Sequence, residues 1–235
     1  MKRKSTKVIC VALFIGLCAL LAKSASNKNP SYEEQLRKIN LNQIDRIMIT
    51  AHPDDEAIFG GNHLAKNRYL VVCVTAGINP KRDRELRRMT RHYHDSCIML
   101  GYPDKTFGVR NNWKTCYKNI NQDLTKILHK KKFKMIVTHN PDGEYGHIHH
   151  KMISKMVTKI ASKSNMKLYY FNHYYTRRQL KNLELTSELS KQDSRQKLTN
   201  LNTFYPSQKK VIEHLKHILP YEQFISQKKW SSSKS

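Results

Sequence analysis

The chain has 235 residues, and its 43 Lys and Arg against 18 Asp and Glu give a formal net charge of +25. This length suits one domain with a full core, and no repeat or break in composition argues for two. The five cysteines include no Cys-x-x-Cys pair, which leaves zinc-finger and thioredoxin-type sites without support. The basic residues are scattered, so we expect a solvated coat, an anionic membrane surface as a partner to consider, and no specific nucleic acid.

The first 26 residues have the composition of a targeting segment. Four basic residues up to Lys7 precede a continuous apolar stretch over residues 8–22, so we predict a signal peptide or an uncleaved signal anchor over 1–26. This charge order predicts that the remainder is exported, to the periplasm or the extracellular space, or is anchored in the membrane. We expect the rest to divide into a linker with a short helix (27–44), a catalytic domain (45–228) and a polar tail (229–235).

Strands and helices alternate from Arg46 onward, which predicts an α/β fold. Strands are expected at 46–50, 69–75, 133–138 and 167–171, with amphipathic helices at 83–100, at 116–130 and after residue 150. The chain beyond about residue 175 is polar and basic, and we expect it to wrap around the domain. Cys73 and Cys97 are expected in the core. The predicted architecture is a Rossmann-like, mostly parallel sheet flanked by helices in a single domain, with the active site at the carboxyl ends of the strands.

Two polar clusters follow two of these strands. The first is His52-Pro53-Asp54-Asp55-Glu56, and the second runs from His139 to His150. Because the carboxyl ends of parallel strands meet at one edge, we expect His52, Asp55 and the His147/His150 pair to converge. Two imidazoles and a carboxylate can bind zinc and leave a fourth position for water, which is the composition of a catalytic zinc site. His139 and His149 are expected as polar surface residues.

These motifs resemble those of the zinc-dependent de-N-acetylases of the PIG-L/LmbE-like family. The resemblance covers roughly residues 45–225, and the first cluster is its most specific part. The other matching segments are Gly60-Gly61, Thr75-Ala76-Gly77, Arg82 three residues before Glu85, Gly146-His147-Ile148-His149-His150 and Tyr205-x-Ser207-Gln208.

The resemblance implies a role for each matched residue. His52, Asp55 and His150 would hold one Zn²⁺, although other divalent metals accept similar ligands. Asp54 would be the general base, and His147 would stabilise the oxyanion or protonate the leaving amine. Arg82 would contact substrate, and Glu56 would orient a metal ligand by a hydrogen bond. One segment departs from the family pattern, because residues 107–112 carry no acid where the family often has an acidic, glycine-containing stretch.

The favoured hypothesis is a zinc-dependent hydrolysis of an N-acetyl amide on a glucosamine-containing glycoconjugate or glycolipid, which releases acetate and a free amine. One alternative is a binding module for anionic lipid or nucleic acid, in which the basic surface is functional and the metal site is vestigial. Another is the same fold acting on a different amide.

Overall fold

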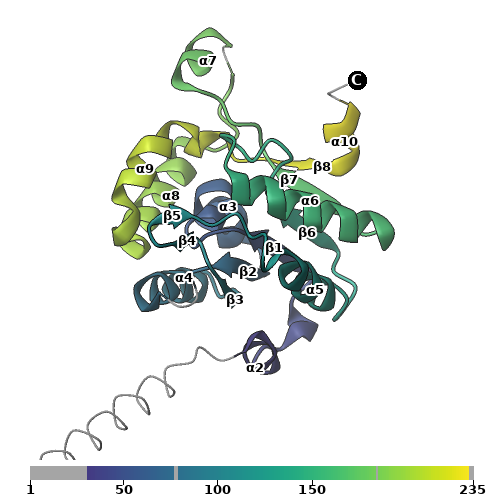
Figure 1. The fold of residues 1–235 in the computed structure, drawn as a ribbon. Helices are drawn as coiled ribbons and strands as arrows, with labels where there is room; N and C mark the ends of the chain where they lie inside the picture. The colour runs from purple at the N-terminus through teal and green to yellow at the C-terminus, as the bar shows by residue number, and fades with distance from the viewer. Residues whose placement is uncertain (1–30, 77–78, 184, 233–235) are drawn as a thin grey trace, which may run out of the picture.

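The computed structural model describes residues 31–76, 79–183 and 185–232. Its centre is a six-stranded sheet in the order β3-β2-β1-β6-β7-β8 (Figure 1). Every neighbouring pair is parallel except β7 and β8. The predicted Rossmann-like α/β fold is therefore confirmed. The strands are β1 (Arg46–Thr50), β2 (Tyr69–Thr75), β3 (Ser96–Tyr102), β6 (Met135–Thr138), β7 (Leu168–Phe171) and β8 (Phe224–Ser226), and a separate hairpin joins β4 (Lys105–Thr106) to β5 (Val109–Arg110).

Helices cover both faces of the sheet because side chains of its strands alternate between two apolar cores. Ile47 and Ile49 of β1 join one core and Met48 joins the other. The first core is closed by α2 (Tyr32–Arg37), α5 (Tyr117–Leu128), α6 (Ile148–Lys163) and α10 (Gln227–Ser232). The second is closed by α3 (Asp55–Lys66), α4 (Pro80–His92), α8 (Lys191–Phe204) and α9 (Lys209–Leu215). The remaining short elements are η1 (Leu41–Gln43), α7 (Arg177–Asn182), η2 (Pro206–Gln208) and η3 (Lys216–Tyr221).

The predicted helix over 83–100 is two elements. Helix α4 ends at His92, and His94 adopts a left-handed conformation with φ of 59° that a helix cannot continue. The chain then forms β3, which pairs with β2 as an edge strand. The spacing of Leu86 and Met89 correctly indicates a helix face, but Cys97 lies on the strand, where it is half-buried. Cys73 is fully buried, as predicted.

The domain extends further in both directions than the sequence predicts. In the segment assigned to a linker, Tyr32 and Leu36 of α2 join the first core. The sheet gains β8 after β7, and Trp230, which was assigned to a polar tail, is buried against Tyr170. The predicted targeting segment, residues 1–26, lies outside the described residues. Within the described ranges, no helix is both long and apolar enough to cross a bilayer.

The Gly60-Gly61 pair lets α3 lie close to the sheet. A Cβ atom at Gly60 would stand 2.6 Å from Met48 Cε and 3.2 Å from Phe224 Cζ. At Gly61 it would touch the stem of Lys197 at 3.4 Å. Glycine at position 60 therefore lets α3 lie close to β1 and β8, and glycine at position 61 lets it lie close to α8.

Lys197 is a buried cation on α8 whose charge is matched by one carboxylate. Its Nζ lies 2.6 Å from Glu222 Oε2, and Glu222 also accepts a hydrogen bond from the backbone of His63. We expect Lys197→Met to lower the free energy of unfolding by about 3 kcal/mol, because Glu222 is left as a buried carboxylate without its main partner. Chemical denaturation of the purified protein measures this change.

The double variant Lys197→Met/Glu222→Gln serves as the matched control. It removes both charges and keeps side chains of similar size, so it should regain part of the lost stability. Equal stability of the single and the double variant would show that the ion pair is not what matters at this position.

Candidate functional site

The two polar clusters meet where the strand order reverses. Strands β1 and β6 are parallel neighbours, with Ile49 paired to Thr138, and their following loops leave the same edge of the sheet (Figure 1). The first loop enters α3 at Asp55, and the second enters α6 after His147, which is its N-cap residue. A crevice at such a reversal point is where open α/β sheets bind their ligands.

Asp55 is the centre of a cluster of imidazoles. Its buried carboxylate lies 3.2 Å from His52 Nδ1, 3.4 Å from His139 Nε2 and 3.4 Å from His150 Nε2. Burial alone would raise the pKa of Asp55, but the His150 and His52 imidazoles hold it well below its ordinary value. The structure therefore brings His52, Asp55 and His150, the residues predicted to hold a metal, into one cluster.

Glu144 orients two of these imidazoles, although the sequence analysis assigned it no role. Its Oε2 lies 3.0 Å from His139 Nδ1 and 2.5 Å from His150 Nδ1. Burial would raise the pKa of Glu144, but the two imidazoles lower it to about 2. His139 is fully buried in this network, and so its predicted surface position is wrong. Hydrogen bonds of this kind are stronger in the protein interior than in contact with water.

His149 also lies inside the protein rather than on its surface. Its ring stacks on Trp113 with centroids 4.0 Å apart, and its Nε2 lies 2.6 Å from the carbonyl oxygen of Asn111. Its other nitrogen faces the Asp104 carboxylate at 3.6 Å, and Asp104 Oδ1 lies 3.3 Å from His52 Nε2. Asp104, a few positions before residues 107–112, thus places a carboxylate against both imidazoles.

Asp54 stands at the start of α3 in an unusual backbone conformation, with φ of 124°. Its buried Oδ1 accepts a hydrogen bond from Arg82 Nη2 at 3.2 Å, and Arg82 also donates to the carbonyl oxygen of Pro53. Burial raises the pKa of Asp54 to about 8, and the Arg82 charge acts in the opposite direction. A strained, buried carboxylate held beside a cation is typical of a functional position.

Glu56 is fully buried and makes a hydrogen bond to the loop that carries Asp54. Its Oε2 accepts the backbone N–H of Asp54 at 3.1 Å, and its Oε1 accepts a very short hydrogen bond from the Tyr205 hydroxyl. The family resemblance predicts that Glu56 orients a metal ligand. Its observed partners are instead the backbone of the expected base and Tyr205, whereas Glu144 contacts the imidazole of an expected ligand.

The Tyr205-x-Ser207-Gln208 segment also makes a hydrogen bond to a second acid, Glu85. Ser207 donates from its backbone N–H and its hydroxyl to the Glu85 carboxylate, at 2.9 and 2.5 Å. Glu85 lies one turn of α4 beyond Arg82, so this contact fixes the helix that carries the predicted substrate-binding arginine. Tyr205 and Ser207 thus connect the C-terminal segment to both walls of the site.

His147 lies next to the cluster and lines the open cleft. Its Nδ1 accepts the backbone N–H of His149 at 3.2 Å, so the neutral ring carries its proton on Nε2. Burial, together with the neighbouring His150 and His52, lowers the pKa of His147 to about 2. This environment favours the neutral ring, which can donate a hydrogen bond through Nε2.

Several sets of donor atoms in this region are close enough to hold a metal ion. Three sets of atoms each lie within 4.8 Å of one another: those of His52, His147 and His150, those of His52, Asp104 and His149, and those of Asp55, His139 and His150. The predicted trio His52, Asp55 and His150 is divided between the first and the third set and is not itself one of them. The buried Nε2 of His150 has no hydrogen-bond partner in the part of the chain that the structure describes. Glu144 contacts the Nδ1 of this ring and leaves its Nε2 facing Asp55, and a carboxylate on the second ring nitrogen is common for metal-ligating imidazoles.

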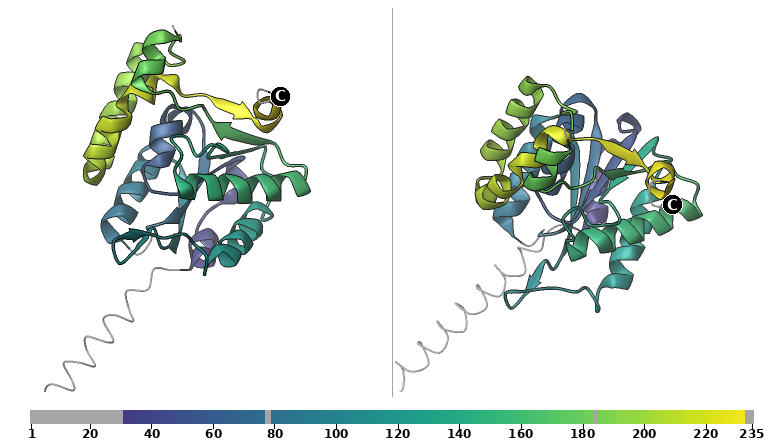
Figure 2. Two further views of the ribbon diagram at one scale, coloured as in Figure 1. Left: turned by 45° about the horizontal axis from the view of Figure 1, so that its top comes forward. Right: turned by 90° about the horizontal axis from the view of Figure 1, so that it is seen from above.

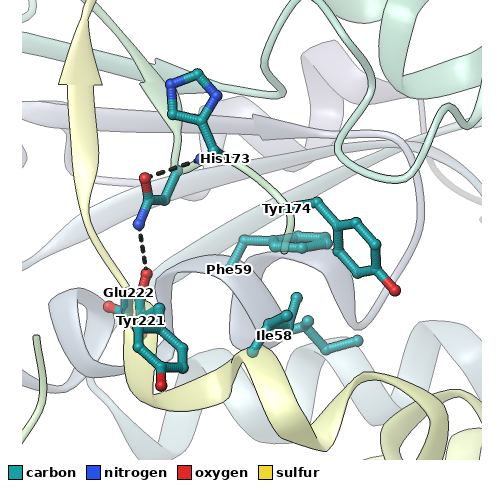
Figure 3. Close-up of a pocket in the computed structure, with 8 residues that line it drawn as sticks. Ile58, Phe59, His173, Tyr174, Tyr221 and Glu222 are labelled. Carbon is teal, nitrogen blue, oxygen red and sulfur yellow. Dashed lines mark hydrogen bonds between the residues drawn. The ribbon is translucent and has the colours of Figure 1, made fainter. Parts of the chain in front are cut away.

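The site opens into a polar cleft of about 660 Å³. His52, Asp54 and Asp55 form its floor, and Arg82, Tyr145 and His147 are among the residues of its walls. The hollow drawn in Figure 3, between Phe59, Tyr174 and Glu222, has a volume of only about 20 Å³, which is room for a single water molecule. The cleft is therefore the part of this region that can admit a substrate.

Comparison with known proteins places this site in a family. The model of the PIG-L family, described as GlcNAc-PI de-N-acetylase, matches residues 47–161, which contain both polar clusters. Residues 47–161 of this chain therefore form a PIG-L domain. An uncharacterized protein of Acanthamoeba polyphaga mimivirus is 34% identical to this chain over 143 residues. That match covers 54% of this chain and 62% of the relative, so the two proteins share only part of the relative's length.

Solved deacetylase structures share the fold of this PIG-L domain. The A40926 pseudoaglycone deacetylase Dbv21 superposes with a TM-score of 0.54 at 14% identity, over 73% of this chain and 85% of its own. A deacetylase of the teicoplanin biosynthesis pathway gives a TM-score of 0.55 at 14% identity, over 77% of this chain and 95% of its own. At this level of identity the likeness establishes the common α/β architecture.

Three residues of the candidate site have no predicted role in the sequence. His139 follows β6 directly and Glu144 lies in the same loop, so their position after a strand end was the available signal. Asp104 lies after β3, a strand that was predicted as helix, so its place at the same edge of the sheet could not be recognised. Each omission followed from an error in assigning exposure or secondary structure.

Proposed function

We propose that this protein hydrolyses the N-acetyl amide of a glucosamine-containing conjugate to acetate and a free amine. The observation that carries the proposal is the pairing of Asp54 with the Asp55-centred imidazole cluster on the floor of one cleft. Asp54 is a buried carboxylate outside the imidazole cluster, and Asp55 lies inside it. Asp54 can therefore act as the base and Asp55 as a metal ligand. The PIG-L domain supports the same reaction class.

The residues present fit a divalent cation, with zinc as the first candidate. His52, Asp55 and His150 would hold it, since their nitrogen and carboxylate donors suit zinc and the buried Nε2 of His150 has no hydrogen-bond partner among the described residues. A bound cation would polarise the amide carbonyl and make the attacking water more acidic. Its positive charge would also lower the pKa of Asp54 from about 8 toward the range of a base at neutral pH.

The chain's own residues would carry the proton and position the substrate. Asp54 takes a proton from water as the water oxygen attacks the acetyl carbonyl carbon, and returns it to the nitrogen as the C–N bond breaks. His147 donates its Nε2 proton in a hydrogen bond to the oxyanion. Arg82 fixes the Asp54 carboxylate and extends along the cleft wall, where sugar hydroxyl groups can reach it.

The cleft supports a sugar conjugate rather than a small apolar amide. Its volume of about 660 Å³ lies within the usual range for ligand sites, and its walls carry Asn79, Lys81 and Gln208 besides the catalytic groups. We further propose, from the sequence of residues 1–26, that the domain works outside the cytoplasm or at a membrane.

The direct test is acetate release by the zinc-loaded full chain from a panel of N-acetylglucosamine conjugates: free, oligomeric, inositol-linked and lipid-linked. Release from any member, and not from the corresponding free amines, supports the proposal, and the best member identifies the conjugate. No release from a folded protein with one bound metal would overturn it in favour of another amide.

Glu144→Gln tests whether the hydrogen bonds behind the cluster support metal binding. We expect zinc affinity to fall about 10- to 100-fold, because the neutral amide no longer fixes the tautomer and orientation of His150. Competition with a chromogenic chelator measures the affinity. The exposed acid Asp142, two residues away, provides the control Asp142→Asn, and an equal loss in both variants would show that Glu144 has no special part.

A further inference from the structure

The β4–β5 hairpin beside the cleft has an apolar tip that no other part of the described chain covers. Phe107 is 101% exposed and Val109 is 71% exposed, the highest values among large apolar side chains of the described residues. Two more apolar side chains are exposed nearby. Tyr145 lies in the loop after β6, and Ile148 is the first residue of α6. Tyr145 lines the cleft, and so do Lys105 and Arg110 at the base of the hairpin.

The conformation of the tip does not explain why it carries an aromatic residue. Phe107 and Gly108 are the two central residues of the turn between β4 and β5, and both have positive φ, of 50° and 80°. Turns of this kind favour Asn-Gly, and a bulky residue at the first position is unfavourable. Folding alone would be better served by Asn, so the ring at residue 107 points to a contact outside the chain.

The base of the hairpin, by contrast, is held firmly. Asn111 donates its backbone N–H to Asp104 at 2.9 Å, and its carbonyl oxygen is bound by His149. Trp113, which follows, is fully buried and donates its Nε1 proton to the carbonyl oxygen of Pro103 at 2.7 Å. The hairpin is therefore attached to the imidazole cluster, and the right-hand view of Figure 2 shows it projecting from the body of the domain.

Basic side chains accompany this apolar tip. Lys105 and Arg110 face each other across the hairpin, and both are exposed and line the mouth of the cleft. Lys81 at the start of α4 is exposed on the same cleft, and Lys114 is exposed just beyond Trp113. An apolar wedge between Lys and Arg side chains is the composition of an element that binds the surface of an anionic bilayer.

We propose that the β4–β5 hairpin inserts Phe107 and Val109 into the interface of an anionic phospholipid bilayer and holds the mouth of the cleft against it. The site would then receive its substrate from the membrane, as a conjugate whose aglycone stays in the lipid. This second statement rests on the proposed deacetylation, whereas the docking itself does not.

A tryptophan at the tip reports insertion directly. The full chain also contains the apolar stretch 8–22, so vesicle binding alone would not identify the contact. Phe107→Trp adds an exposed indole to a protein whose own Trp113 and Trp230 are buried. With vesicles of phosphatidylcholine and phosphatidylglycerol, we expect its emission to move to shorter wavelength and to be quenched by lipids brominated on the acyl chain, and less so at high salt.

Leu183→Trp is the matched control, since Leu183 is an exposed apolar residue at the end of α7, apart from the hairpin (Figure 1). Its emission should not change with the same vesicles. An unchanged spectrum of the Phe107→Trp variant, or equal quenching in both variants, would overturn the proposal. A shift of the Phe107→Trp emission that grows with protein concentration without lipid would overturn it in favour of self-association.

Catalysis gives the second measurement. Phe107→Asn/Val109→Thr keeps the turn and its strand but removes the apolar wedge. We expect about tenfold slower turnover of a lipid-linked substrate in anionic vesicles and unchanged turnover of a soluble N-acetylglucosamine conjugate. Equal loss on both substrates would overturn docking. Absence of turnover by the parent chain would instead count against the proposed function, while the fluorescence result would still decide docking.

Discussion

Asp54→Asn is expected to lower kcat by about 10²- to 10⁴-fold without loss of bound metal. The amide has the same shape as the carboxylate and can still accept the hydrogen bond from Arg82, so the loop and the Asp55 cluster should stay in place. What the variant loses is the ability of this side chain to take a proton from water. Steady-state acetate release and metal content, measured on the same sample, test the prediction.

Asp55→Asn separates the two neighbouring acids. This variant should lose metal as well as activity, because Asp55 faces His52 and His150 directly. If Asp54→Asn also loses its metal, Asp54 is a ligand and not the base. If Asp54→Asn keeps both its metal and full turnover, the base must be another group in the cleft.

Metal removal is expected to abolish turnover completely. Dialysis against a chelator should give a folded, inactive protein, and zinc should restore the activity. A cation held by Asp55 and its imidazoles would join the loop after β1 to the start of α6, so binding should also stabilise the fold. At free zinc a hundredfold above its Kd, the free energy of unfolding should rise by about 2.7 kcal/mol. Thermal unfolding with and without zinc measures this rise.

His150→Ala supplies the comparison for that experiment. It should be inactive, and zinc should neither rescue it nor raise its Tm as in the parent protein. Full turnover by chelated protein with no detectable metal would contradict the role assigned to the cluster. A Tm rise of the same size in His150→Ala would place the stabilising ion elsewhere.

The sequence was most informative where the pattern was local. Strands β1 and β2 were predicted at their observed bounds, because each is a continuous run of buried apolar residues with a polar stop. The same logic found the two loops that meet at the site, since the end of a buried parallel strand fixes the edge at which its loop emerges.

Contacts between distant segments were not predictable in this way. Strand β8 joins the sheet only through pairing with β7, more than 50 residues earlier, and its own three residues carry no periodic signal. His139 is a polar residue in the sequence, yet it is buried because Glu144 pairs with its Nδ1 and the backbone N–H of Ala51 donates to its Nε2. Position beside a charged partner, rather than residue type, decides its exposure.

The bond between Tyr205 and Glu56 joins residues 149 positions apart. During synthesis, strands β1 to β7 leave the ribosome before Tyr205, so the parallel part of the sheet can assemble while Glu56 still lacks this partner. The base-bearing loop reaches its final form only when the last segment of the chain has been made. The proposed activity is therefore expected only after Tyr205 has been made, late in the synthesis of the chain.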